Sequence, residues 1–338
     1  MYRWLRHGLF ALDPERAHDV AMQSLSAAHR LGLLSTWWPK PQLRPIECLG
    51  LRFENPVGLA AGLDKNADHL DALGALGFGH IEVGTVTPRP QSGNQRPRMF
   101  RLTSHHAIIN RLGFNNKGVD HLVVQLKKRS FGGIVGANVG KQKETPIEQA
   151  AQDYRFCIER IFAHCDYITI NVSSPNTENL RQLQDQGHLK ELLQELVSLR
   201  DHLTTAVGKH TPLLIKIAPD WVPGGLELAL ETIGDSGIDG LIVTNTTVDH
   251  TSVANHRHAQ EAGGLSGKPL LSPANRVLKT ARQVLGDHFP IIGVGGILCG
   301  DDALSKARQG ANLVQVYTGL IYRGPTLIRE CVQAWPSH

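Results

Sequence analysis

The pattern of apolar and polar positions changes near residue 55. Beyond that point, short uncharged runs alternate with amphipathic segments of helical period. The apolar runs predict eight strands, at 57–61, 80–86, 133–139, 167–172, 213–218, 240–245, 290–294 and 313–318. Helices are predicted between them, at 67–76, 147–162, 189–206, 226–235, 273–285 and 301–309. Eight strands with alternating helices favour an α/β fold of the (β/α)8 TIM-barrel type over an open doubly wound sheet.

The first 40 residues have a different pattern, with two amphipathic helices predicted in succession. The first helix places Trp4, Leu5, Gly8, Leu9 and Leu12 on one face. Asp13 is the expected N-cap of the second helix and Pro14 its first residue. The Trp-Trp-Pro-Lys-Pro stretch at 37–41 then predicts a rigid linker. We therefore divide the chain into a small N-terminal helical domain at 1–40 and a barrel at 41–338. The pattern alone fits either a peripheral membrane contact or helices packed on the barrel.

Composition narrows the class of protein. The 338 residues are 41% hydrophobic and 20% charged, as in a soluble globular protein. The net charge of +4 is too small to indicate nucleic-acid binding by itself. Residues 1–44 carry six basic and three acidic side chains, so most of this charge lies in the N-terminal part. We find no apolar run of the roughly 18–20 residues that a membrane span needs, and no secretory signal pattern.

Cysteine and histidine usage argues against a metal or a disulfide framework. The five cysteines are scattered and form no Cys-x-x-Cys pair, which disfavours disulfides, zinc and an iron–sulfur cluster and favours a reducing cytoplasm. The seventeen histidines show no metal-ligand spacing. We expect no metal site.

Polar residues gather where the predicted strands end. The stretch 167–177, Tyr-Ile-Thr-Ile-Asn-Val-Ser-Ser-Pro-Asn-Thr, runs from a buried strand into a loop with two Asn amides and serine hydroxyls. The carboxyl ends of barrel strands form the catalytic face of such folds. An ordinary strand-to-helix turn would also contain Ser, Pro and Asn. Long connections at 87–115 and 246–271 are expected to cover the same face.

The other strand ends indicate a flavin and a flat, polar substrate. Glycines after the seventh and eighth strands, such as Gly296, predict a phosphate site, although tight turns also need glycine. Lys216 brings a positive charge among apolar neighbours, which would stabilise the negative charge of a reduced flavin near N1. Asparagine offers both a donor and an acceptor, which suits a pyrimidine ring. The candidates for this ring of amides are Asn110, Asn171, Asn176 and Asn245, with Lys65 supplying charge.

Residues 56–325 resemble the dihydroorotate dehydrogenase family throughout. The stretches that carry the resemblance are AAGLDKN at 60–66, IEVGTVTPR at 81–89, NRLGFNN at 110–116, GANVG at 136–140, Asn171–Thr177, KIAP at 216–219, NTT at 245–247, GGLSGK at 263–268 and GVGGI at 293–297. The N-terminal helices, with PERAH at 14–18, are similar to the quinone-linked, membrane-associated class (class 2). That class uses a serine as catalytic base where cytosolic classes use cysteine, and Ser174 occupies this position.

The resemblance implies a flavoprotein oxidoreductase that oxidises (S)-dihydroorotate to orotate, the fourth step of pyrimidine biosynthesis. Ser174 would take the C5 proton while the C6 hydride passes to N5 of one FMN per chain. The implied FMN contacts are Ala61, Gly62, Leu63, Asp64, Lys65, Thr85, Asn138, Asn171, Lys216, Thr244, Gly267, Gly296, Tyr317 and Thr318. The implied substrate contacts are Lys65, Asn110, Arg111, Leu112, Gly113, Phe114, Asn171, Asn176, Asn245 and Thr246.

The resemblance also implies partners and a location. A membrane quinone would enter between the N-terminal helices and take the electrons. The protein would then be a peripheral monomer on the cytoplasmic face of the cell membrane, in contact with lipid and without a nucleic-acid partner. Three other functions compete with this one. They are a tRNA dihydrouridine synthase, a soluble fumarate- or NAD-linked dehydrogenase and a non-catalytic phosphate-binding scaffold. The near-neutral charge of the barrel argues against a tRNA enzyme, and the serine at position 174 argues against the soluble dehydrogenases. A scaffold would not need Lys65 and Lys216 facing one cavity.

Overall fold

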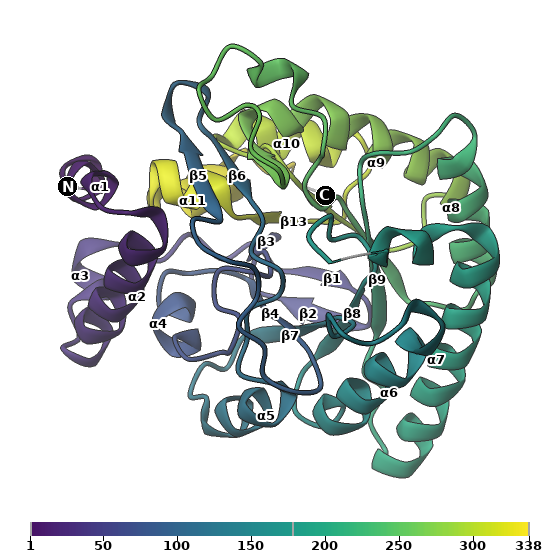
Figure 1. Ribbon diagram of the computed structural model, residues 1–338. Coiled ribbons are helices and arrows are strands. Elements are labelled where there is room, and N and C mark those ends of the chain that lie inside the picture. Colours follow the sequence, from purple (N-terminus) through teal and green to yellow (C-terminus); the bar gives the residue numbers. More distant parts are fainter. Residues whose placement is uncertain (1, 178, 337–338) are drawn as a thin grey trace.

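A closed barrel of eight parallel strands forms the centre of the computed structural model, which describes residues 2–177 and 179–336 (Figure 1). The predicted (β/α)8 TIM barrel is thereby confirmed. Around the barrel the strands follow in chain order: β3 (Val57–Leu59), β4 (His80–Val86), β7 (Ile134–Val139), β8 (Tyr167–Asn171), β9 (Leu213–Ile217), β10 (Gly240–Val243), β12 (Ile291–Val294) and β13 (Leu313–Val316). Each of the eight predicted strands is present, and most end one or two residues earlier than the sequence pattern indicated.

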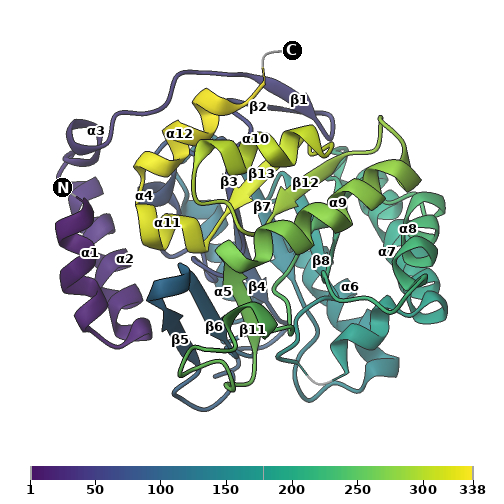
Figure 2. The ribbon, with the colours of Figure 1, turned by 90° about the horizontal axis from the view of Figure 1, so that it is seen from above.

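Helices surround the barrel, as Figure 2 shows from above. Each segment predicted as helical overlaps one observed helix: α4 (Leu70–Gly74), α6 (Ala150–Ile161), α7 (Gln186–Val207), α8 (Gly225–Asp235), α9 (Leu271–Leu285) and α10 (Gly300–Arg308). Three further helices were not predicted: α5 (Val119–Lys128), α11 (Thr318–Arg323) and α12 (Thr326–Ala334). The apolar faces of these helices pack on the strands and form the main hydrophobic core.

The N-terminal helices form a separate layer on one side of the barrel (Figure 1). They are α1 (Tyr2–Ala11), α2 (Pro14–Arg30) and α3 (Leu34–Trp37). The predicted cap is confirmed, since the Asp13 carboxylate accepts the backbone N–H groups of Glu15 and Arg16 at 3.0 and 3.1 Å. Among the residues that the structure describes, no helix is both long and apolar enough to span a bilayer. The division at residue 40 stays a prediction.

Two small antiparallel sheets were not predicted from the sequence. A hairpin of β1 (Ile46–Cys48) and β2 (Leu51–Phe53) places Phe53 and Cys48 against the inner side chains at the amino end of the barrel. The two long connections contribute β5 (Met99–Leu102), β6 (Ala107–Asn110) and β11 (Gly264–Gly267) to one antiparallel sheet. This sheet holds the connections over the carboxyl ends of the barrel strands, as expected from their length.

The barrel interior changes from apolar to polar along its axis. At the amino end, the rings of His80 and Tyr167 fill space that only glycine leaves open. A Cβ atom on Gly58 or Gly136 would lie 2.1 or 2.0 Å from these rings. The next inward positions carry Glu82 on β4 and Thr169 on β8, and the level above carries Asn138 and Asn171. This polar half of the interior faces the catalytic end of the fold.

Candidate active site

A polar cavity opens at the carboxyl ends of the barrel strands. Its lining comes from the ends of seven barrel strands, all but β7, and from the antiparallel sheet above them. The predicted residues in the lining are Ala61, Gly62, Lys65, Thr85, Asn110, Leu112, Gly113, Phe114, Asn171, Ser174, Asn176, Lys216, Thr244, Asn245, Thr246, Gly267, Gly296, Tyr317 and Thr318. The structure therefore gathers into one cavity most of the side chains that the sequence singled out.

Hydrogen bonds fix the amide groups at the cavity floor. Asn171 donates through Nδ2 to the Thr85 hydroxyl at 3.0 Å and to Asn138 Oδ1 at 3.2 Å. Its own Oδ1 accepts the Ser173 hydroxyl at 3.0 Å and Asn245 Nδ2 at 3.4 Å. Because Asn245 and Asn171 share this bond, both amides are held in one orientation before any ligand binds.

The loop after β8 presents Ser174. This serine is 5% exposed, lines the cavity, and accepts the Asn176 N–H through its hydroxyl oxygen at 3.2 Å. Asn176 in turn donates from Nδ2 to Asn110 Oδ1 at 3.4 Å. A hydroxyl that accepts a backbone N–H keeps its own proton available to another group.

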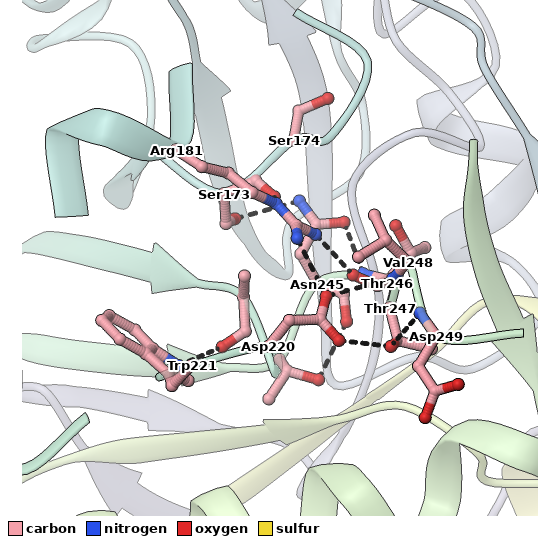
Figure 3. A network of polar contacts seen from close by, with 12 residues as sticks. Ser173, Ser174, Arg181, Asp220, Trp221, Asn245, Thr246, Thr247, Val248 and Asp249 are labelled. Atoms are coloured by element: carbon pink, nitrogen blue, oxygen red, sulfur yellow. Dashed lines mark hydrogen bonds and ion pairs between the residues drawn. The ribbon is translucent and has the colours of Figure 1, made fainter. Parts of the chain in front are cut away.

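Arg181 and Asp220 hold the loops around Ser174 in place (Figure 3). Arg181 donates to the backbone oxygens of Ser173 and Thr246 at 3.2 and 3.0 Å, and to Asp220 at 2.9 Å. Asp220 also accepts the Thr247 hydroxyl and the Val248 N–H. One ion pair thus joins the loops that follow β8, β9 and β10. Sequence reasoning missed both residues.

The cavity is cationic. Among the described residues, its lining includes Lys65 and Lys216 and no carboxylate. Burial, followed by the charge of Arg98, lowers the pKa of Lys65 to about 8, and its ammonium donates to Asn115 Oδ1 at 2.8 Å. Burial also lowers the pKa of Lys216, and the negative charge of Glu82 opposes this shift. Such a lining suits an anionic ligand.

The glycine-rich side of the cavity lies after β12 and β13. Gly295, Gly296, Thr318 and Gly319 line it together, and Thr318 marks the start of α11. The Thr318 hydroxyl donates to that of Ser266 at 2.8 Å. Backbone at these two loops and at the start of a short helix is the usual phosphate site of a barrel.

Four of the predicted contact residues lie outside the cavity lining. Leu63 lines a neighbouring apolar cavity, and the buried Asp64 carboxylate accepts the N–H groups of Asp68 and His69. Arg111 forms an ion pair with Glu261 at 2.8 Å. Asn138 lies beneath the floor, where Nδ2 donates to Glu82 at 2.8 Å. Lining residues that we did not predict include Ser266, Leu270, Val294 and Gln315. They lie in or near segments in which neighbouring glycines or polar residues were selected as candidates instead.

An apolar cavity of about 740 Å³ separates the N-terminal helices from the barrel. Its walls come from α1, α2 and α3 on one side and from α4, β5 and α11 on the other. Arg101 is the charged side chain among the described lining residues; His18 also lines the cavity, and burial lowers its pKa to about 4. Tyr317 lines both this cavity and the polar one. The two cavities therefore meet at a single aromatic side chain.

Comparison with known proteins gives a consistent result. The family model of dihydroorotate dehydrogenase matches residues 45–337. The "Dihydroorotate dehydrogenase (quinone)" of Marinobacter nauticus is 54% identical over 334 residues, covering 99% of this chain and 98% of the relative. The protein of the same name from Xanthomonas euvesicatoria pv. vesicatoria is 52% identical, covering 99% and 95%. The crystal structure of DHODH from Eimeria tenella in complex with ferulenol has a TM-score of 0.87 at 36% identity, covering 98% of this chain and 93% of that one.

Proposed function

The chain belongs to the dihydroorotate dehydrogenase family, and we propose that it oxidises (S)-dihydroorotate to orotate and passes the electrons through FMN to a quinone. The observation that supports this most strongly is the contact between two unlike cavities. One is polar and cationic and suits an anionic pyrimidine with a flavin, and the other is apolar and suits a quinone. Tyr317 separates them, so electrons would have only one side chain to pass.

We propose that Ser174 is the base that removes the C5 proton. It is the hydroxyl that the loop after β8 brings to the cavity surface, whereas the Ser173 hydroxyl is already bound to Asn171. The amides of Asn110, Asn171, Asn176 and Asn245 would hold the pyrimidine ring, and Lys65 would pair with its carboxylate. These groups would orient C5 toward Ser174 and exclude water from the reacting face.

We propose that the cavity holds one FMN per chain. Lys216 would face the part of the ring that gains negative charge, and the loops with Gly296 and Thr318 would hold the phosphate. A bound flavin supplies the hydride acceptor that no protein side chain provides. Released flavin should therefore amount to one FMN per purified chain, and a flavin-free active protein would contradict the proposal.

We propose that the quinone occupies the apolar cavity. Ala21 on α2 lines it, and Gln23 on the same helix is exposed and lies outside it. Ala21→Trp should fill the cavity and slow quinone reduction tenfold or more, since the quinone ring and the indole compete for one space. Reduction of the flavin by dihydroorotate should be unchanged. Gln23→Trp is the matched control, and an equal effect of both variants would contradict the assignment.

We propose that the N-terminal layer makes a peripheral contact with the cell membrane, on its cytoplasmic face. Trp4 is 81% exposed, Leu31 72% and Trp37 44%, on a layer with a net positive charge. Exposed aromatic and aliphatic side chains next to arginines are typical of helices that lie in a lipid interface. We further propose that the protein acts there as a monomer.

The whole proposal is tested by mixing the purified protein with dihydroorotate and a short-chain quinone. Orotate should form in step with loss of the quinone. Orotate formation that depends on fumarate or NAD⁺ in place of a quinone would place the chain in a soluble class.

A further inference from the structure

A buried carboxylate lies in the barrel interior beneath the cavity. Glu82 on β4 is 0% exposed and accepts four hydrogen bonds. Asn138 Nδ2 donates to Oε1 at 2.8 Å. Gln315 Nε2, the Tyr167 hydroxyl and the Thr169 hydroxyl donate to Oε2 at 2.8, 3.2 and 3.3 Å. Four donors on two oxygens fit the ionised carboxylate, which has only acceptors.

The register of the strands places Lys216 one level above Glu82. Thr169, which touches Glu82, pairs with Leu214 on β9. Two residues further on, Asn171 pairs with Lys216, and both line the cavity. Since inward positions recur every second residue, Lys216 lies on the cavity side of the level that holds Glu82.

These two residues are the charged pair of the interior. The eight barrel strands contain Glu82 and Lys216 as their only acidic and basic side chains apart from His80. Burial lowers the pKa of His80 to about 3, so its ring is neutral. The other titratable groups that face this region are Tyr167 on β8, Tyr317 after β13 and Lys65 in the loop after β3. A buried ammonium without an opposite charge is strongly disfavoured.

We propose that Glu82 is a positioning residue for Lys216: its buried carboxylate is the counter-charge that keeps the Lys216 ammonium charged within the buried wall of the cavity. The negative charge of Glu82 also offsets the positive charge of Lys216 and thereby lowers the midpoint potential of a flavin bound beside it. Only this second effect rests on the proposed function, because it needs a flavin beside Lys216. Glu82 touches neither substrate nor cofactor in this view and acts through its neighbour.

The charge and the shape of Glu82 can be separated. Glu82→Gln keeps the length and removes the charge, and its oxygen can still accept from Asn138 if Gln315 turns its unpartnered Oε1 toward the new amide. Glu82→Asp keeps the charge and shortens the side chain. Tyr167→Phe removes one donor and keeps the carboxylate, so it is the matched control. A residue needed only for packing and hydrogen bonding would suffer more from Asp than from Gln.

The first test measures the midpoint potential of the bound flavin from pH 6 to pH 10. In Glu82→Gln, the potential at pH 6 should rise by an equilibrium factor of about ten, which is roughly 30 mV for a two-electron couple. The pH at which loss of the Lys216 proton lowers the potential should fall by about one unit, a tenfold change in proton affinity. Glu82→Asp and Tyr167→Phe should leave both values close to wild type. Equal profiles for Gln and wild type, or a larger effect of Asp than of Gln, would overturn the proposal.

The second test needs no flavin. Melting temperatures are compared for Glu82→Gln, Lys216→Met and the double variant of the full chain. Removing one charge leaves the other buried and unpaired, whereas removing both removes that penalty. The double variant should therefore melt several degrees higher than the sum of the two single losses predicts. Additive losses would overturn the proposal even if the wild-type protein proved to carry no flavin, so this result is distinct from failure of the proposed function.

Discussion

The Glu15 carboxylate helps to fasten the N-terminal layer to the barrel through ion pairs with Arg98 and Arg96, and its loss should loosen that layer alone. Glu15, in the first turn of α2, accepts the Nε and Nη2 groups of Arg98 at 3.1 and 2.9 Å. The side chains are 13% and 6% exposed. Breaking a fully buried pair costs about 3–5 kcal/mol. Arg98 also donates to the backbone oxygens of Ser92 and Asn94, and Glu15 keeps some contact with water, so we expect about 2 kcal/mol for Glu15→Ala.

A cost of about 2 kcal/mol corresponds to a roughly thirtyfold change in an equilibrium constant. Amide hydrogen exchange in α2 should accelerate by that factor in Glu15→Ala, because the helix detaches more often. Exchange in α7, on another side of the barrel, should not change. Arg96→Ala is the matched control. Arg96 Nε contacts the same carboxylate at 2.9 Å but is 66% exposed, so its loss should cost less than about 1 kcal/mol. Acceleration below threefold for Glu15→Ala, or equal effects of both variants, would refute this reasoning.

Three further predictions concern ligand binding, lipid binding and the stability of the fold. Orotate affinity, read from the flavin spectrum, should be constant from pH 6 to 7 and fall above pH 8. Burial and the charge of Arg98 lower the pKa of Lys65 to about 8, so above this pH Lys65 loses the charge that pairs with the carboxylate. Lys65→Met should bind orotate weakly at every pH, and a pH dependence that persists in this variant would exclude Lys65 as its source. Replacing both Trp4 and Leu31 with Glu should reduce binding to anionic lipid vesicles at least tenfold in a sedimentation assay, whereas the same change at Val222, 74% exposed on the barrel, should not. Tyr154→Phe should lower the free energy of unfolding by about 1 kcal/mol in urea titration, since the Tyr154 hydroxyl donates to the backbone oxygen of Asn171 at 2.9 Å. A loss of less than about 0.3 kcal/mol would mean that this hydrogen bond is dispensable.

The parts of the fold that were predictable share one property, namely long apolar periodicity. The strand at 167–172 was recognisable because every residue of β8 is buried and uncharged. The helix at 189–206 was recognisable because buried leucines such as Leu189, Leu193 and Leu196 recur at helical spacing. The β1–β2 hairpin was missed because its strands have three residues each and only Phe53 and Cys48 are buried. The pairing of β11 with β6 was missed because it joins segments more than 150 residues apart. The β5–β6 hairpin is local, but its strands have only four residues each and lie within a long connection. The α5 helix did carry a readable stripe, with Val119, Leu122 and Leu126 buried on one face.

The same contrast holds for the site. Residues that end a strand, such as Lys216 and Asn245, were identified because parallel topology brings strand ends together. Arg181 and Asp220 lie in loops, and their ion pair depends on three loops meeting in space. Glu82 lies in the middle of an apolar strand, where its inward direction is not visible without the register. The assignment of Asn138 to the cofactor stays a prediction: its Nδ2 donates to Glu82 below the floor, and its Oδ1 accepts hydrogen bonds from Thr85 and Asn171 in the cavity lining.

The most direct measurement is anaerobic stopped-flow bleaching of the bound flavin by dihydroorotate, with wild type and Ser174→Ala compared at the same pH. Wild type should bleach rapidly, and the variant should bleach at least about a hundredfold more slowly, since general-base catalysis typically contributes a factor of 10² to 10⁴. Ser173→Ala, whose hydroxyl is bound to Asn171, should be slowed far less. Equal bleaching in wild type and Ser174→Ala would contradict the role of the serine, and no bleaching of a flavin-loaded wild type would contradict dihydroorotate as the substrate.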